Sequence, residues 1–232
     1  RLALGGVRAT APMTTWLPGS GARLAPGAWS PLDADAADHV RVLRLRDGDV
    51  VTIFDGRGHA ANATLSMHDG VPGALVRAEP TLAPEPRFTL VQAVPKGDKL
   101  DDVVRMATEI GVRAIHVALS EHAVARPRGE RADKRVARLG RIAWAAAAQA
   151  EQAWVPYVLA PAPLAEVAAR APTSVLRVLA APRVGAALAG LESEDLARGA
   201  WLLVGPEGGL SSHEARALEQ GGWRAMALPP GI

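Results

Sequence analysis

The chain has 232 residues, of which 49% are hydrophobic and 22% charged; its formal net charge is +2 and it has no cysteine. This length suffices for one large domain or two small ones with packed cores. The lack of cysteine excludes a disulfide framework and a cysteine-based zinc site. No apolar run reaches the roughly 18 residues of a membrane-spanning helix, and residues 1–21 lack the unbroken apolar stretch of a signal peptide. We therefore expect a soluble, cytoplasmic protein with no membrane partner.

The first part of the chain, residues 1–83, is predicted to be mainly β. Short β-prone runs alternate with Asp-Gly turn signals. These turns fall at residues 47–48, 55–56 and 69–70. Turns at this spacing predict a small antiparallel barrel. Before the first turn, the pattern of residues 33–45 predicts a short helix, with Asp33 or Asp35 as its N-cap.

The second part of the chain is predicted to be an α/β domain. Residues 81–88 contain two prolines in a polar stretch and form the best linker, so we divide the chain into domains 1–83 and 84–232. Strands are predicted at residues 88–94, 113–119, 174–181, 200–205 and 223–228. Helices are predicted from Asp98 to Gly111, from Asp133 to Ala153 and from Ser211 to Gly222. Alternating strands and helices predict a parallel sheet with helices on both faces.

Positive charge is concentrated in two places along this nearly neutral chain. Seven Lys or Arg residues lie between Arg126 and Arg141, and a second cluster contains Arg41, Arg44 and Arg46. Basic patches of this kind suit an anionic partner such as nucleic acid. A solvated helix face is the alternative interpretation of either cluster.

The most informative stretch is WLLVGPEGGLSSHE, residues 201–214. An apolar strand runs into a glycine-rich turn, and Ser211 with Glu214 forms a capping box for the next helix. In open parallel sheets ligands bind beyond the carboxyl ends of the strands, and glycines let a ligand approach the backbone closely. The stretch matches neither a P-loop nor G-x-G-x-x-G. Because Glu207 would repel a phosphate, a neutral or cationic ligand fits better.

Four segments in this order resemble the RsmE family, bacterial methyltransferases of the SPOUT, or trefoil-knot, superfamily. The segments are DHVRVLRLRDGDVVTIFDGRG (38–58), VQAVPKGDKLDDVVRMATEIGV (91–112), LLVGPEGGLSSHE (202–214) and MALPPGI (226–232). The resemblance implies a C-terminal SPOUT-type trefoil-knot domain with a parallel sheet and a small N-terminal PUA-like β-barrel. It also implies S-adenosylmethionine-dependent methylation of N3 of a uridine in 16S ribosomal RNA. The expected partners are ribosomal RNA or the small ribosomal subunit and, as a homodimer, a second copy of the chain.

In such folds the bent cofactor lies between three loops, which map here to residues 179–181, 205–209 and 228–232. The expected cofactor-binding residues are Leu179, Ala180, Val204, Gly205, Glu207, Gly208, Gly209, Leu228 and Ile232. Glu207 is expected to orient its loop or to hold a polar group of the cofactor; satisfying nearby amides is the structural alternative. The expected RNA-contacting residues are Arg41, Arg44, Lys96, Lys99, Arg105, His122, Arg131, Arg135, Arg138 and Gln149. No residue is assigned as the base for the uridine N3 proton.

The sequence also departs from the family pattern. Gln152 stands where the family usually has Arg, and in the last motif Pro229 and Gly231 replace Gly and Arg. In relatives a further helix follows that motif and threads the knot, and the chain ends before it. Two alternatives keep the fold: an RNA-binding protein with an impaired cofactor site, and a methyltransferase for another RNA. An unrelated α/β enzyme that binds a nucleotide is the third.

Overall fold

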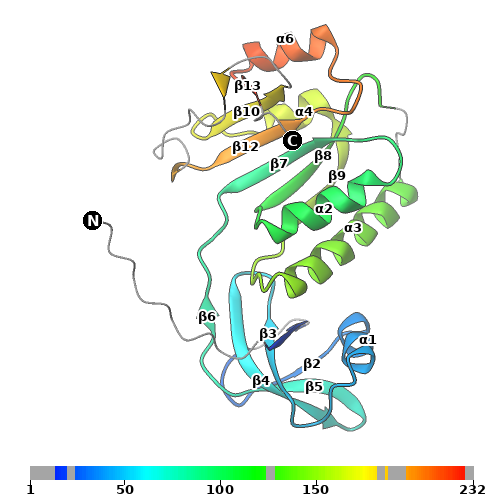
Figure 1. Ribbon diagram of the computed structural model, residues 1–232, viewed down its shortest axis with the longest axis vertical. Helices are drawn as coiled ribbons and strands as arrows, with labels where there is room; N and C mark the ends of the chain where they lie inside the picture. Colours follow the sequence, from blue (N-terminus) through cyan, green and yellow to red (C-terminus); the bar gives the residue numbers. More distant parts are fainter. Residues whose placement is uncertain (1–13, 20–23, 124–128, 182–185, 188–196, 228–232) are drawn as a thin grey trace. The chain divides into compact units, whose positions relative to one another are not determined.

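In the computed structural model, the described residues are 14–19, 24–123, 129–181, 186–187 and 197–227. The chain forms two compact units (Figure 1). The first unit contains Arg1–Asp55 and His59–Leu82, and the second contains Gly56–Gly58 and Ala83–Ile232. None of the helices in the described residues is both long enough and apolar enough to cross a membrane.

The first unit is built on a mixed β-sheet that closes on itself. Its strands are β1 (Thr15–Pro18), β2 (Trp29–Pro31), β3 (Val50–Phe54), β4 (His59–His68), β5 (Val71–Val76) and β6 (Thr81–Leu82). They pair in the order β1-β3-β4-β5-β2, with β6 beside β4, and an antiparallel bridge between Gly19 and Leu32 joins the two edges. The prediction of a wholly antiparallel barrel is wrong at one pair, because β1 and β3 run parallel. A long connection through β2 and α1 separates these two strands, and such crossovers bring strands together in the same direction.

Helix α1 (Ala34–Val42) is capped at its N-terminus by the side chain of the preceding residue, Asp33. The Asp33 carboxylate accepts the backbone N–H of Ala36 at 2.8 Å, so Asp33 rather than Asp35 is the N-cap. Inside the unit, side chains such as Leu17, Val51 and Ile53 are fully buried. The alternation of apolar residues along the strands therefore builds the core of this barrel.

The second unit contains a seven-stranded sheet in which every pair is parallel. Its strands are β7 (Phe88–Ala93), β8 (Ala114–Leu119), β9 (Tyr157–Pro163), β10 (Leu176–Ala181), β11 (Ala186–Ala187), β12 (Ala200–Val204) and β13 (Arg224–Ala227). They lie in the order β11-β13-β10-β12-β7-β8-β9. The predicted α/β architecture with a parallel sheet is confirmed.

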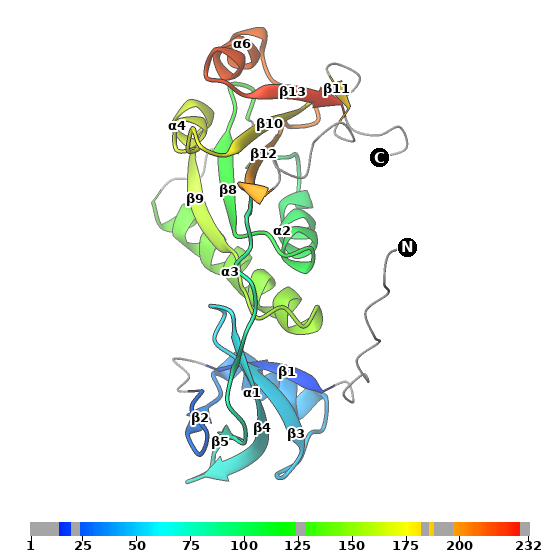
Figure 2. The same cartoon turned by 90° about the vertical axis from the view of Figure 1, so that its left-hand side faces the viewer.

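Helices cover both faces of this sheet. They are α2 (Lys99–Glu109), α3 (Glu130–Gln149), α4 (Leu164–Ala169) and α6 (Ser212–Gln220). In β8, Ile115 and Val117 pack with α2 and α3, whereas the neighbouring Ala118 packs with α4 and α6. Because side chains alternate across a strand, the two helix pairs lie on opposite faces (Figure 2).

Two details of the helices differ from the prediction. The long helix was expected over residues 133–153 and instead runs from Glu130 to Gln149, because the chain turns at Glu151, whose φ is 53°. Asp98 was expected to cap α2, but its side chain makes no capping hydrogen bond. Its φ of −97° and ψ of 9° lie outside the extended conformation that a capping side chain requires.

Candidate functional site

The expected cofactor loops follow the carboxyl ends of three neighbouring strands of the parallel sheet. In the registers of the sheet, Ala180 of β10 pairs with Val204 of β12, and Ala181 of β10 pairs with Ala227 of β13. Since all three strands are parallel, the segments that follow them leave the sheet side by side at its carboxyl-terminal end. Two of the expected cofactor residues, Leu228 and Ile232, lie outside the described residues. The side chain of Leu179 is buried in the core beneath α4 and α6, so only its backbone is available to a ligand.

The glycine turn after β12 presents open backbone. The N–H of Gly209 donates to the carbonyl of Pro206 at 2.8 Å and closes a tight turn, in which Gly209 has a φ of +75°. No described atom lies within 4 Å of the place where a side chain would begin at Gly208 or Gly209. The turn therefore has room for a ligand to approach its main chain.

Glu207 ties this turn to the segment that leads into α2. One oxygen of its carboxylate accepts the backbone N–H of Lys96 at 3.1 Å, and the other accepts the Nζ of Lys99 at 2.8 Å. The hydrogen bonds from Lys99, from its own backbone and from Lys96 lower the pKa of Glu207 to about 2. Glu207 is thus ionised at neutral pH, and the chain itself engages both of its oxygens.

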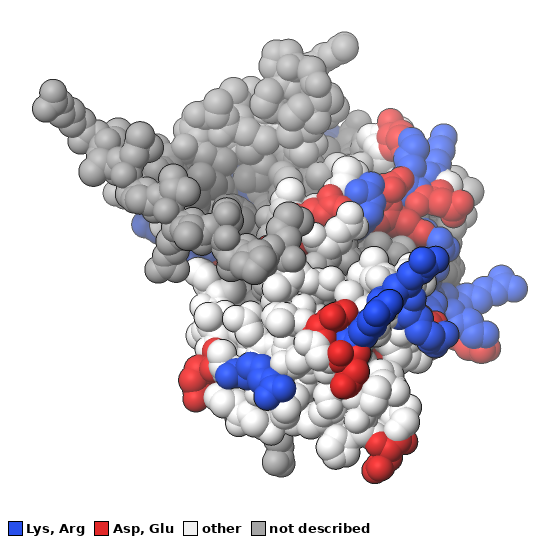
Figure 3. All heavy atoms as spheres, turned by 60° about the horizontal axis from the view of Figure 1, so that its bottom comes forward, with Lys and Arg blue, Asp and Glu red and all other residues white. Residues whose placement is uncertain are grey.

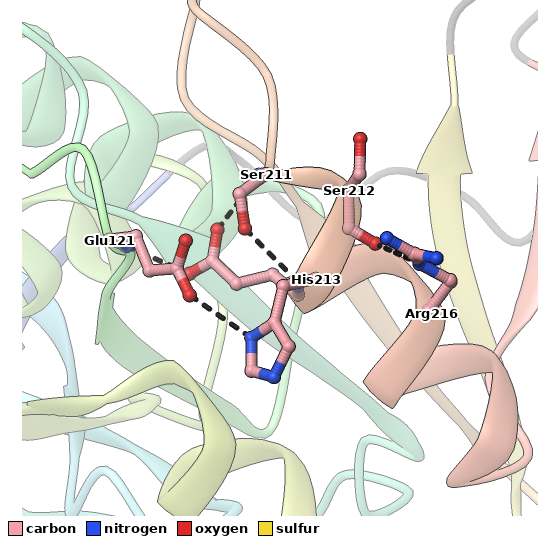
Figure 4. A network of polar contacts seen from close by, with 6 residues as sticks. Glu121, Ser211, Ser212, His213 and Arg216 are labelled. Atoms are coloured by element: carbon pink, nitrogen blue, oxygen red, sulfur yellow. Dashed lines mark hydrogen bonds and ion pairs between the residues drawn. The ribbon is translucent and has the colours of Figure 1, made fainter.

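The helix after the turn is joined to the loop after β8. The Ser211 Oγ accepts the N–H of Glu214 at 3.1 Å, and the Glu214 carboxylate accepts the N–H of Ser211 at 3.0 Å, so the predicted capping box is confirmed. The other Glu214 oxygen accepts the backbone N–H of Glu121 at 2.8 Å. The Glu121 carboxylate lies 3.1 Å from His213 Nδ1 (Figure 4). Sequence reasoning missed this pair, because 92 residues separate its members.

Some of the residues expected to contact RNA already form ion pairs with acidic residues of the chain, and others do not. Lys99 pairs with Glu207, Arg105 with Asp102 and Glu109, Arg138 with Asp101, and Arg41 with Asp38. On the face of the molecule shown in Figure 3, basic and acidic side chains lie next to one another. An ion-paired arginine has less charge to offer a phosphate than an unpaired one.

The other expected RNA-contacting residues form no ion pair among the described residues, and most of them are exposed. Arg131 and Arg135 lie on α3, where Arg131 is exposed and Arg135 half-buried. His122 is exposed in the loop after β8, and Gln149 is exposed at the end of α3. The part of the chain that the structure describes contains no group of His, Cys, Asp or Glu residues arranged to hold a metal ion.

Comparisons with known proteins agree with this architecture. A family model described as an RNA methyltransferase domain matches residues 83–232, and one described as an RNA methyltransferase PUA domain matches residues 32–69. Ribosomal RNA small subunit methyltransferase E of Mycobacterium bovis is 31% identical over 217 residues, which cover 89% of this chain and 81% of that protein. The protein of the same name from Synechocystis is 30% identical over 81% of this chain and 62% of its own length.

Among solved structures, ribosomal RNA small subunit methyltransferase E from Neisseria gonorrhoeae bound to S-adenosyl methionine is similar to this chain. It superposes with a TM-score of 0.83 at 27% identity, over 95% of this chain and 91% of that one. The matches to a PUA domain and to an RNA methyltransferase domain place the chain in the class of RNA methyltransferases. Within that class, the chain belongs to the family of ribosomal RNA small subunit methyltransferase E.

Proposed function

We propose that this protein transfers a methyl group from S-adenosylmethionine to N3 of a uridine in 16S ribosomal RNA. The observation that carries the proposal is the glycine turn at residues 205–209, whose backbone is accessible at Gly208 and Gly209. The turn lies at the carboxyl ends of β10, β12 and β13. The names of the family members and the cofactor of the Neisseria protein support the same reaction. The position on the RNA rests on the family resemblance of the sequence.

The residues of the turn fit a cofactor that carries its positive charge on a sulfonium. Gly208 and Gly209 leave their backbone accessible, while Glu207 fixes the turn through Lys96 and Lys99. The bound cofactor supplies an electrophilic methyl group. The chain would hold the cofactor at main-chain groups of residues 205–209 and 179–181; the third expected loop, residues 228–232, lies outside the described residues. Positioning of the two substrates is the main contribution that we assign to the protein.

RNA binding is assigned to both units. The PUA-like barrel, with Arg41 and Arg44, and the arginines of α3 are proposed to contact phosphates, which fix the position of the RNA without reading its sequence. The target uridine has to leave its base stack to present N3 to the methyl group. Because its substrate is ribosomal RNA, we place the enzyme in the cytoplasm.

We further propose that the protein is a homodimer. Met106 and the C-cap residue Ile110 lie four positions apart at the C-terminal end of α2, and 49% and 80% of their surfaces are exposed. Residues four apart lie on the same face of a helix. Two large apolar side chains on one exposed face favour a protein interface.

The test is direct. Ribosomal RNA from a strain that lacks the gene is digested, and N3-methyluridine is measured by mass spectrometry, with and without the gene restored. We expect the modified nucleoside to disappear from 16S ribosomal RNA and to return on complementation. Loss of a methylated nucleoside from transfer RNA instead would favour the alternative substrate. No change in any RNA, together with no binding of S-adenosylmethionine, would favour an RNA-binding protein with an impaired cofactor site.

A further inference from the structure

The amino-terminal end of the parallel sheet carries a row of side chains on the face that packs with α4 and α6. The registers of five neighbouring strands place its members beside one another: Tyr157, Ala114, Thr89, Trp201 and Arg177. Neighbouring strands are about 4.8 Å apart, so this amino-end row is about 19 Å long from Tyr157 of β9 to Arg177 of β10. A row of this length can contact several units of a polymer.

An exposed aromatic ring stands at one end of the amino-end row. Tyr157 is the only tyrosine of the chain, and 60% of its surface is exposed at the start of the edge strand β9. Trp201, in the middle of the row, is half-buried, and its ring centroid lies 4.6 Å from that of His116. Trp201 thus belongs to the core, whereas the ring of Tyr157 is free to stack on a nucleic-acid base.

Three arginines near the row form no ion pair with the described residues. Arg87 is exposed directly before β7, and its guanidinium donates to the carbonyl of Ala197 at 2.6 Å. Arg170 is exposed at the C-cap of α4. Burial and the positive charge of Arg170 lower the pKa of His116, so Arg170 lies near this part of β8. Arg177 is the half-buried end of the row itself.

Positive charge exceeds negative charge around the row. The segments that lead into β7, β8, β9, β10 and β12 are residues 85–87, 111–113, 154–156, 173–175 and 197–199, and Glu85 is their only acid. Glu85 is already paired with Arg113. Helix α4 adds one acid, Glu166, against the three arginines named above. Such an excess of arginine attracts a polyanion.

We propose that the amino-end row binds a single-stranded segment of the RNA substrate, with a base stacked on Tyr157 and phosphates at Arg87, Arg170 and Arg177. The inference rests on the proposed function, because it assigns the bound polyanion to the RNA that is methylated. A stacking ring combined with a positively charged track is the arrangement of single-strand sites. A duplex keeps its bases stacked on one another and would leave the ring without a partner.

This segment of RNA would lie away from the reacting uridine. Arg177 precedes Ala181, the last residue of β10, by four positions, which corresponds to about 13 Å along the strand. The expected cofactor loops follow the opposite, carboxyl ends of the strands. The amino-end row therefore contributes to binding of the RNA and not to the chemical step.

The first test measures binding of a 12-nucleotide oligouridylate by fluorescence anisotropy. Tyr157→Ala should weaken binding about tenfold, which is within the range for loss of one base stack, whereas Tyr157→Phe keeps a ring and should bind as the wild type does. A duplex of the same length should bind the wild type and Tyr157→Ala equally. Equal binding of the oligouridylate by these two proteins, or no binding by the wild type, would overturn the proposal and leave the row to another partner.

The arginines are tested by the salt dependence of oligouridylate binding. Arg87→Gln combined with Arg170→Gln should reduce the slope of log affinity against log salt by about 1.4, because each phosphate contact of a single strand contributes about 0.7. Arg216→Gln is the control, since Arg216 is an exposed arginine of α6 outside the row. An unchanged slope in the double variant, or an equal reduction in the control, would contradict the assignment.

A final comparison separates this inference from the proposed function. With a 16S ribosomal RNA fragment as substrate, Tyr157→Ala should raise KM about tenfold and leave kcat unchanged. An unchanged KM, despite weaker binding of the oligouridylate, would show that the row does not hold the methylated RNA. If the wild type transfers no methyl group and Tyr157→Ala still weakens oligouridylate binding, the proposed function fails and the single-strand site remains.

Discussion

At the scale of single residues, Glu207 explains how a turn can be both open and fixed. Glycines at 208 and 209 remove side chains from the path of a ligand, but they also leave the main chain free to move. Glu207 offsets this freedom by accepting hydrogen bonds from Lys96 and Lys99. The contacts of Glu207 with Lys96 and Lys99 thus give this acidic residue a role in holding the turn that does not depend on the bound cofactor.

This contact should respond to pH in a defined direction. The pKa of Glu207 is lowered from 4.5 to about 2, so the contact stabilises the fold fully above pH 4.5 and is lost as the pH falls towards 2. We expect a carbon-13 NMR titration of the Glu207 carboxyl to show this low midpoint. In Lys99→Met the midpoint should move up towards 4.5. An unchanged midpoint in that variant would mean that the ion pair is absent in solution.

Gly208 and Gly209 should respond differently to the same substitution. Gly208 is not among the residues with positive φ and has open space around it, so Gly208→Val should fold normally. Its side chain should nevertheless obstruct the cofactor and weaken binding of S-adenosylmethionine about tenfold or more, the usual effect of overpacking a site. Gly209 has a φ of +75°, so Gly209→Val should also lower the melting temperature.

Calorimetry and thermal unfolding of both variants separate the two effects. Unchanged affinity in a folded Gly208→Val protein would place the cofactor away from this turn.

At the scale of elements, the sequence predicts those parts of the sheet whose signals are local. Strands β7, β10 and β12 are apolar runs that end at turn residues, and their positions are predicted within two residues. Strand β9 was missed, because Pro161 and Pro163 interrupt it and it lies at the edge of the sheet, half-buried. Edge positions tolerate proline, so the usual signals of a strand are weak there.

In the candidate site, too, the features set by adjacent residues were predictable from the sequence, and the contacts between distant residues were not. The glycine turn and the Ser211–Glu214 capping box are readable from adjacent residues. The partners of Glu207 are more than 100 residues away, and the contact forms because β12 pairs with β7. That neighbour relation depends on the order of the strands, which the sequence pattern does not specify. Glu121 and His213 were missed for the same reason.

Helix α3 provides a prediction about RNA binding. Arg131 and Arg135 have no ion-pair partner among the described residues, whereas Lys134 pairs with Glu130. If both arginines contact phosphates of a duplex, replacing both with Ala should reduce the slope of log affinity against log salt by about 2. Lys134→Ala should change it little. Filter binding at several salt concentrations measures the slopes, and identical slopes would make this helix face a solvated surface.

At the scale of the whole molecule, function should depend on a second copy of the chain. The homodimer that we propose would cover Met106 and Ile110, which are the exposed apolar residues at the end of α2. A stable interface buries about 1,200–2,000 Å² in total, so these two side chains can form only part of it. A charge placed at the centre of such an interface would be buried without a partner.

Ile110→Glu tests this arrangement. Ile110 is 80% exposed, so the substitution should leave the fold of the monomer intact. Burying an unpaired carboxylate costs several kcal/mol, so dimerisation should weaken about a hundredfold or more. Sedimentation velocity over a range of concentrations measures this, with Ile110→Leu as the apolar control. If the variant is a folded monomer that no longer methylates RNA, the active site needs the partner subunit. If the wild type is itself monomeric at all concentrations, the exposed pair belongs to another interface and the homodimer is wrong.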